Sequence, residues 1–245
     1  MPVRRFGTTS PILPVLERHY RYLPMESQGP CCFFLLARRR TKMNATHPGA
    51  QSVHGGLNPQ TLVEKIMRNR VYASVYWKEQ CFGLTAETLV DKAVELAEFG
   101  GTFGGNQQPT RFLCLLLKML QLQPELEVVR QFIENDDYKY VTVLGAVYLR
   151  LVGRPRDVYT LLEPLLSDYR KVRKRNVIGW ELTHVDEIAD ALLHDEYYID
   201  LALPRLVDRE VLERTEGLPP RRSPLEDELD APSDSSDSDD EKEEE

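Results

Sequence analysis

The most continuous apolar stretch of the chain predicts a helix over residues 110–121, directly after a glycine-rich segment. Large apolar residues occupy almost every position, and only Arg111, Lys118 and Gln121 are left to contact water. A helix that is apolar on nearly every face must be covered on all sides by other elements. We therefore expect this helix to lie at the centre of a helical domain.

Helical periodicity extends on both sides of this segment. Asn58, Thr85 and Pro124 are typical of helix starts, and each precedes apolar residues at three- and four-residue spacing. The last helix is expected over about residues 195–214, with an interruption near a proline. The pattern predicts one helical domain over residues 44–215.

One interruption of the helical pattern predicts a short β-hairpin near residues 170–183. Residues 170–175 and 180–183 show little helical periodicity, and residues 176–179 between them have the composition of a turn. The expected fold class is therefore all-α: a single multi-helix domain that carries this short hairpin and a disordered acidic C-terminal tail.

The two ends of the chain differ from the domain in charge and composition. Residues 1–42 hold eight basic and two acidic residues, whereas residues 226–245 hold twelve acidic residues and one lysine, a formal charge of −11. Residues 43–225, between them, carry a formal charge of only −3. We expect residues 1–43 to be a disordered extension or a mis-assigned start, and residues 216–245 to be a disordered, acidic, serine-rich tail.

Membrane and disulfide-rich classes fit the composition poorly. No apolar run approaches the roughly 20 residues that a membrane helix needs, so we expect a soluble protein without a membrane partner. The four cysteines show no paired or metal-type spacing, which favours a reducing compartment.

Catalytic chemistry also finds little support. The glycine pairs at 100–101 and 104–105 lack the lysine and hydroxyl residue of a phosphate-binding loop, so a turn that lets two packed helices approach closely is the favoured explanation. The histidines and cysteines of the domain show no spacing typical of a metal or nucleophile site. We therefore expect no enzyme, no metal site and no cofactor.

The clearest candidate binding site is a run of basic residues in the predicted hairpin. Five positive charges within six residues would attract phosphate groups or an acidic peptide. A solvated surface, a contact with protein or RNA, and a nuclear-import sequence are all open as explanations. The candidate residues are Arg170, Lys171, Arg173, Lys174 and Arg175.

The acidic tail contains two candidate phosphorylation sites. Ser236 and Ser238 each have an acidic residue three positions further on, a spacing that suits an acid-directed kinase. Each phosphate would add about −1.5 to −2 charges. The simpler explanation is a solubilising tail.

Several segments, in order along residues 52–215, together resemble the pre-mRNA-splicing factor 38 family. One is the run Gly-Gly-Asn-x-x-Pro-Thr-x-Phe-Leu-Cys-Leu that begins at Gly104. The other matching segments are Val53–Gln60, Tyr76–Glu87, Tyr138–Tyr140 with Leu144–Ala146, His184–Glu187 and Leu203–Leu206. The extension before Met43 and the acidic tail, in place of the long Arg-Ser tail of many animal members, depart from the family pattern.

The resemblance implies a nuclear, non-enzymatic scaffold of the spliceosome that is needed for spliceosome activation in pre-mRNA splicing. The implied partners are other spliceosomal proteins, including a zinc-finger splicing protein and the microfibrillar-associated protein, and the tri-snRNP. The alternative function is a direct RNA-binding module that acts through the basic hairpin. The nearly neutral domain argues against affinity driven by phosphate contacts alone.

Overall fold

The structure is a computed structural model that describes residues 46–47 and 51–221. It divides into two compact units, residues 1–205 and residues 206–245, of which the second contains α10. The helices are η1 (Pro59–Leu62), α2 (Lys65–Ala73), α3 (Val75–Glu79), α4 (Ala86–Val94), α5 (Arg111–Leu122), α6 (Leu126–Ile133), α7 (Lys139–Val152), α8 (Pro155–Leu162), η2 (Glu163–Ser167), α9 (Val185–His194) and α10 (Arg209–Glu216). The strands are β1 (Phe99–Gly100), β2 (Thr102–Phe103), β3 (Gln108–Pro109), β4 (Lys171–Arg175), β5 (Trp180–His184), β6 (Tyr197–Tyr198) and β7 (Leu201–Ala202).

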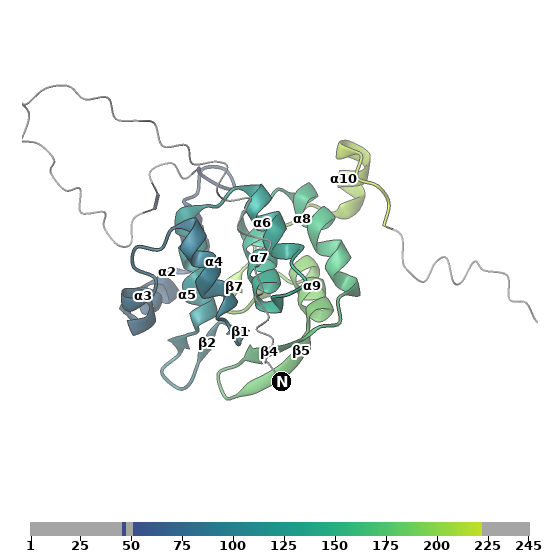
Figure 1. The fold of residues 1–245 in the computed structure, drawn as a ribbon. Helices are drawn as coiled ribbons and strands as arrows, with labels where there is room; N and C mark the ends of the chain where they lie inside the picture. The colour runs from purple at the N-terminus through teal and green to yellow at the C-terminus, as the bar shows by residue number, and fades with distance from the viewer. Residues whose placement is uncertain (1–45, 48–50, 222–245) are drawn as a thin grey trace, which may run out of the picture. The chain divides into compact units, whose positions relative to one another are not determined.

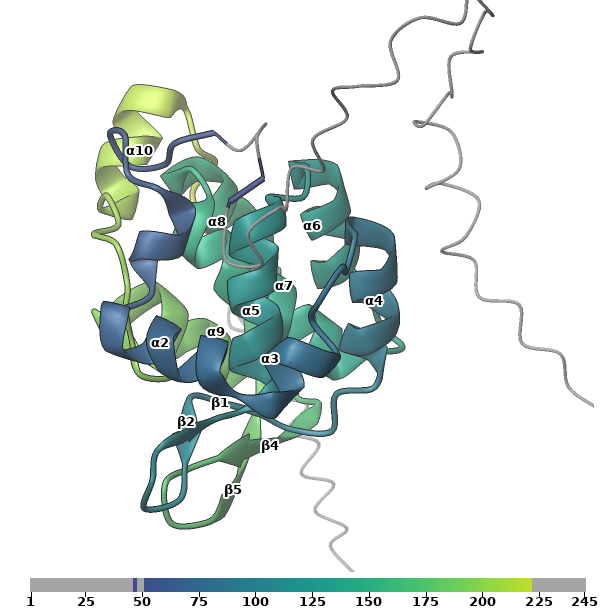
Figure 2. The ribbon, with the colours of Figure 1, turned by 90° about the vertical axis from the view of Figure 1, so that its left-hand side faces the viewer.

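Helix α5 lies in the middle of the first unit, as its apolar composition predicts. Its residues from Phe112 to Gln121 are all buried. Thr110 begins the helix: its hydroxyl accepts the Leu113 N–H (3.2 Å) and donates to the Gly100 carbonyl (2.7 Å). Helix α7 is the second buried helix and packs against α5, and Figures 1 and 2 show the other helices of the unit around this pair.

The expected exposure of two polar residues on α5 is wrong. Lys118 and Gln121 are only 8 % and 3 % exposed. The Lys118 ammonium lies 5.8 Å from the centre of the Trp77 ring, so the ring face partly replaces water around the charge. Burial still lowers the pKa of Lys118. The polar residues of this helix are therefore covered by neighbouring elements as well.

The expectation of an all-α fold is also wrong, because the described chain contains three small sheets. One sheet has the order β1–β4–β5, with a parallel β1–β4 pair and an antiparallel β4–β5 pair. The pairs β2–β3 and β6–β7 are separate two-stranded sheets. Apart from β4 and β5, each strand has two residues, which is too short to show the alternation that reveals a strand in a sequence. The hairpin expected near residues 170–183 is formed by β4 and β5.

The predicted helix over residues 195–214 is likewise replaced by other elements. The β6–β7 hairpin turns at Ile199 and Asp200, which both have positive φ angles, 52° and 56°. Two consecutive residues in this conformation form a tight hairpin turn and end any helix. Only α10 remains helical, and it begins with an extended Asp208.

The sheets gather at one end of the helices. Figures 1 and 2 both show β2 and the β4–β5 hairpin extending from the same end of the first unit. The two hairpins contact each other, because the Gly104 N–H donates to the Val177 carbonyl (2.9 Å). This end carries the basic residues singled out in the sequence.

Several expectations fall outside the described residues. They concern the extension over residues 1–43, most of the tail over residues 216–245, and both candidate phosphorylation sites, Ser236 and Ser238. The boundaries of the domain over residues 44–215 stay a prediction.

Candidate functional site

The basic residues divide between the two faces of the β4–β5 hairpin. Lys171, Arg173 and Arg175 alternate with the buried Val172, so they lie on the outer face. The pairing aligns Arg173 with Leu182 and Arg175 with Trp180. A basic column on β4 therefore lies beside a largely apolar column on β5.

Arg170 does not belong to this exposed surface, because it is used to fix the start of β4. Its guanidinium group forms an ion pair with Asp168 (2.6 Å) and donates to the Asp136 carbonyl (2.7 Å) and to Thr142 Oγ1 (3.3 Å). Burial of Asp168 favours its neutral form, but the hydrogen bonds and charge of Arg170 outweigh burial and lower the pKa of Asp168. Arg170 is thus a structural residue.

Two arginines of the outer face stack on Trp180. The guanidinium carbons of Arg175 and Arg173 lie 4.2 and 5.3 Å from a ring centre of this tryptophan. Arg175 also lies 5.1 Å from the ring centre of Phe103, on β2. Cation–π contacts hold these charges in place without neutralising them.

Large apolar side chains concentrate on the same hairpin. Trp180 and Leu182 are 53 % and 60 % exposed, and Ile178 at the tip is fully exposed. Val177 and Tyr169 are exposed as well. Exposed apolar and arginine side chains in one patch are typical of protein-interaction sites, where tryptophan and arginine contribute most of the binding energy.

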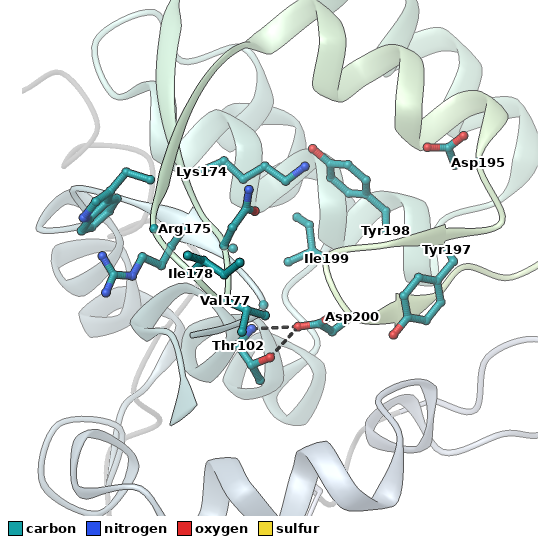
Figure 3. A pocket seen from close by; sticks show the side chains of 15 residues that line it. Thr102, Lys174, Arg175, Val177, Ile178, Asp195, Tyr197, Tyr198, Ile199 and Asp200 are labelled. Atoms are coloured by element: carbon teal, nitrogen blue, oxygen red, sulfur yellow. Dashed lines mark hydrogen bonds between the residues drawn. The ribbon is translucent and has the colours of Figure 1, made fainter. Parts of the chain in front are cut away.

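A hollow of about 770 Å³ lies between the hairpin and the β6–β7 turn (Figure 3). On one side it is closed by Asp200, whose carboxylate accepts the Thr102 N–H and hydroxyl, both at 2.8 Å. Gly100 and Gly101 make this approach possible: a Cβ at Gly101 would overlap the Asp200 carboxylate, and one at Gly100 the Arg175 carbonyl. Gly100 also has a φ of +154°, which favours glycine.

The other side of the hollow pairs a cation with an aromatic ring. Lys174 points toward Tyr198 in Figure 3, with its ammonium 5.4 Å from the ring centre, and lies 3.9 Å from Glu181. Burial raises the pKa of Tyr198, and Asp195 and other nearby carboxylates add to this effect. Tyr198 is therefore neutral at physiological pH.

Two histidines of the described chain serve structural roles. His184 precedes α9 and shares reciprocal capping hydrogen bonds with Glu187, and His54 bonds to the Leu151 carbonyl (2.7 Å). Among the described residues no group of histidines, cysteines and acids could hold a metal ion. No described helix is long and apolar enough to cross a membrane.

The two described cysteines are buried thiols. Burial raises the pKa of Cys81 to about 12 and that of Cys114 to about 11. A nucleophilic cysteine needs a lowered pKa and access to solvent, so neither thiol fits that role.

Sequence reasoning found the basic cluster but missed the residues that complete the site. The contribution of Phe103 and of the β6–β7 turn depends on contacts between distant segments, which a sequence pattern does not display. The exposed Trp180 and Ile178 carried a usable signal, because large apolar residues at a hairpin tip have no core to enter.

Fold and site together define a class: a mostly helical domain that exposes a basic and aromatic β-hairpin at one end. A family model described as the PRP38 family matches residues 52–216. The chain belongs to this family, which confirms the resemblance seen in the sequence motifs.

Named relatives agree with this membership. Pre-mRNA-splicing factor 38 of Arabidopsis thaliana is 59% identical over 187 residues, covering 76% of this chain and 52% of that protein. Pre-mRNA-splicing factor 38A of Xenopus tropicalis is 59% identical over 188 residues, 76% of this chain and 60% of that protein. The Homo sapiens protein of the same name is 57% identical with the same coverage. This chain therefore spans about half to three fifths of the length of these relatives.

The fold is similar to a chain in the crystal structure of the Snu23-Prp38-MFAP1(217-258) complex of Chaetomium thermophilum. The two chains are 40% identical with a TM-score of 0.68, and the match covers 72% of this chain and 92% of that chain. The similarity thus extends over nearly the whole of that chain.

Proposed function

We propose that this chain is a non-catalytic scaffold of the spliceosome that binds other splicing proteins and is needed for spliceosome activation in pre-mRNA splicing. The observation that carries the proposal is the 40% identical chain, matched over 92% of its length, in a complex of Snu23, Prp38 and MFAP1. Membership of the PRP38 family and the names of the relatives support the same role. The proposed location is the nucleus, where splicing takes place.

The proposed partners are a Snu23-like zinc-finger splicing protein, an MFAP1-like protein and, through the assembled particle, the tri-snRNP. The 40% identical chain, found in a complex whose named proteins are Snu23, Prp38 and MFAP1, supports these partners.

Copurification of the full chain from nuclear extract tests the proposal. We expect a tagged chain to recover Snu23-like and MFAP1-like proteins and to restore splicing in extract depleted of the endogenous protein. A matched variant, Leu116→Ala in the buried helix α5, should copurify less of these partner proteins in proportion to the fraction of it that is unfolded. Recovery of no splicing protein by the folded chain would contradict the scaffold role.

A second candidate function is direct RNA binding by the hairpin. The observation that favours it is the stack of Arg173 and Arg175 on the exposed Trp180, since single-stranded RNA binds to aromatic side chains flanked by cations. The RNA affinity of the full chain, measured at salt concentrations from about 50 to about 200 mM, separates the two functions. An RNA-binding hairpin should lose affinity steeply with salt and with Trp180→Ala.

A further inference from the structure

One edge of the β1–β4–β5 sheet has unpaired backbone groups. In an antiparallel pair, the N–H and C=O groups of alternate residues point toward the partner strand and those between them point away. The Asn176 N–H donates to the Gly179 carbonyl (2.9 Å), and this bond fixes the alternation along the β4–β5 ladder. The backbone groups of Trp180 and Leu182 therefore point away from β4. Among the described residues, no strand lies on that side of β5 and no hydrogen bond outside the ladder reaches these backbone groups.

The side chains of β5 leave this edge unprotected. Edge strands of natural proteins are usually blocked by a charged side chain, a proline or a bulge. On its outer face β5 instead exposes Trp180 and Leu182. Glu181, the acidic residue of the strand, lies on the opposite face, 3.9 Å from the Lys174 ammonium. Exposed apolar side chains beside free backbone groups are typical of an edge that pairs with a strand of another protein.

The charge beside this edge is positive and uncompensated. Among the described residues no ion pair involves Lys171, Arg173 or Arg175. Both guanidinium groups stack on Trp180, so they extend from β4 across β5 toward the free edge. An added strand lies about 4.8 Å from its neighbour, so its outer side chains would meet these cations.

The three features together specify the occupant. Free backbone groups favour an extended segment, the stacked guanidinium groups favour carboxylates, and Trp180 and Leu182 favour apolar side chains. Because alternate residues of a strand share a face, acidic and apolar residues at alternate positions satisfy both requirements. The β5 strand of a second copy fits less well, since it would bring two sets of the same cations together. RNA fits less well too, because aliphatic Leu182 offers nothing to phosphates or bases.

We propose that β5 accepts, as a fourth strand of the sheet, an extended segment of a partner protein in which acidic and apolar residues alternate on one face. The backbone of the segment pairs with the free groups of Trp180 and Leu182, and its carboxylates bind the guanidinium groups of Arg173 and Arg175. The proposal rests on the scaffold role, to which it adds a class of partner. Its tests use the purified chain and a synthetic peptide, so their failure leaves the copurification of splicing proteins unaffected.

The first test measures binding of the fluorescent peptide Thr-Asp-Thr-Val-Thr-Asp-Thr-Val-Thr to the full chain by anisotropy. In extended conformation this peptide presents aspartate and valine alternately on one face. We expect Arg173→Glu/Arg175→Glu to weaken binding at least tenfold, about 1.4 kcal/mol. The control Arg154→Glu/Arg156→Glu reverses two exposed arginines at the same spacing near α8 and should leave the affinity unchanged. Equal affinities of the two double variants, or no binding to the unaltered chain, overturn the proposal.

A second pair of variants separates backbone pairing from side-chain contact. Leu182→Pro removes an N–H that the β4–β5 ladder does not use, so we expect the sheet to persist and peptide binding to be lost. Leu182→Ala keeps that N–H and should retain measurable binding. An unchanged NMR indole signal of buried Trp77 shows that each variant is folded. Equal affinities of two folded variants contradict pairing at this edge.

Amide hydrogen exchange of the unaltered full chain tests the same point without any substitution. We expect the amides of Trp180 and Leu182 to exchange at least tenfold more slowly when the chain is saturated with the peptide. The amide of Glu181 points toward β4 and should change far less. Peptide binding without protection of Trp180 and Leu182 would mean a purely electrostatic contact, which overturns the proposal.

Other occupants of the edge give distinct results. Without peptide, protection of Trp180 and Leu182 that rises with protein concentration indicates a second copy, and protection that does not rise indicates a segment of the same chain. Displacement of the labelled peptide by oligouridine at lower concentration than by unlabelled peptide indicates RNA. Any of these three results overturns the proposal.

Discussion

Single residues fix the end of the first unit where the sheets meet. Gly101 leaves room for the Asp200 carboxylate, which in turn holds Thr102 with two hydrogen bonds. A methyl group at Gly101 would push this acceptor away from donors that are largely removed from water. The glycine pair is therefore explained by close packing, although it allows strands to approach rather than the helices that the sequence suggested.

Gly101→Ala should destabilise the protein by about 1–3 kcal/mol, because the added Cβ overlaps the Asp200 carboxylate. Denaturant unfolding measures this change. The matched control is Gly105→Ala, whose Cβ would meet no atom within 4 Å. Equal stabilities of the two variants would contradict the close contact.

The Asp168–Arg170 ion pair gives a pH-dependent prediction. Because the folded pKa of Asp168 is lowered from 3.8, its stabilisation is complete above that value and is lost as the pH falls through the lowered folded pKa. Asp168→Asn should lower the free energy of unfolding by about 1–3 kcal/mol at pH 7. The difference from the unaltered protein should shrink below pH 3.8, and urea unfolding at several pH values measures it.

Asp91→Asn, at an exposed position of α4, is the control for this ion pair. It should change stability little at any pH. A constant deficit of the Asp168 variant across the acidic range would mean that the carboxylate charge does not contribute.

At the scale of elements, the buried helices are what the sequence predicts best. Helix α5 has 12 residues, a length that exceeds most buried strands, and its cap at Thr110 marks its start within one residue. The two-residue strands were missed because their pairing depends on partners far along the chain, such as Phe99 with Lys174. The basic residues of the site were identifiable from the sequence, whereas their stacking on Trp180 follows from strand register alone.

Leu116→Ala should cost about 2–5 kcal/mol, because it leaves a cavity in the fully buried helix α5. Ile66→Ala on α2 removes a similar side chain that is 64% exposed, and it should cost far less. Thermal and denaturant unfolding measure the stability lost in each of these two variants, one at a buried and one at an exposed position. Similar losses in both variants would show that α5 is not the centre of the core.

At the scale of the whole molecule, the buried thiols report on global unfolding. Cys81 and Cys114 have raised pKa values and lie in the core. We expect neither to react with iodoacetamide at pH 8 in the native protein, and both to react together in denaturant. Mass spectrometry of the labelled peptides measures each site. Fast labelling of one cysteine alone under native conditions would indicate local opening around it.

The Thr102–Asp200 clamp joins residues that are 98 positions apart, and the parallel β1–β4 pair also connects distant segments. Contacts of such high contact order form slowly, because a long loop must close before they contribute any stability. The helices, held mainly by nearby neighbours, can assemble first. The hairpin end should therefore be the last part of the unit to form during refolding, so hydrogen exchange during refolding should protect β4 amides later than those of α7.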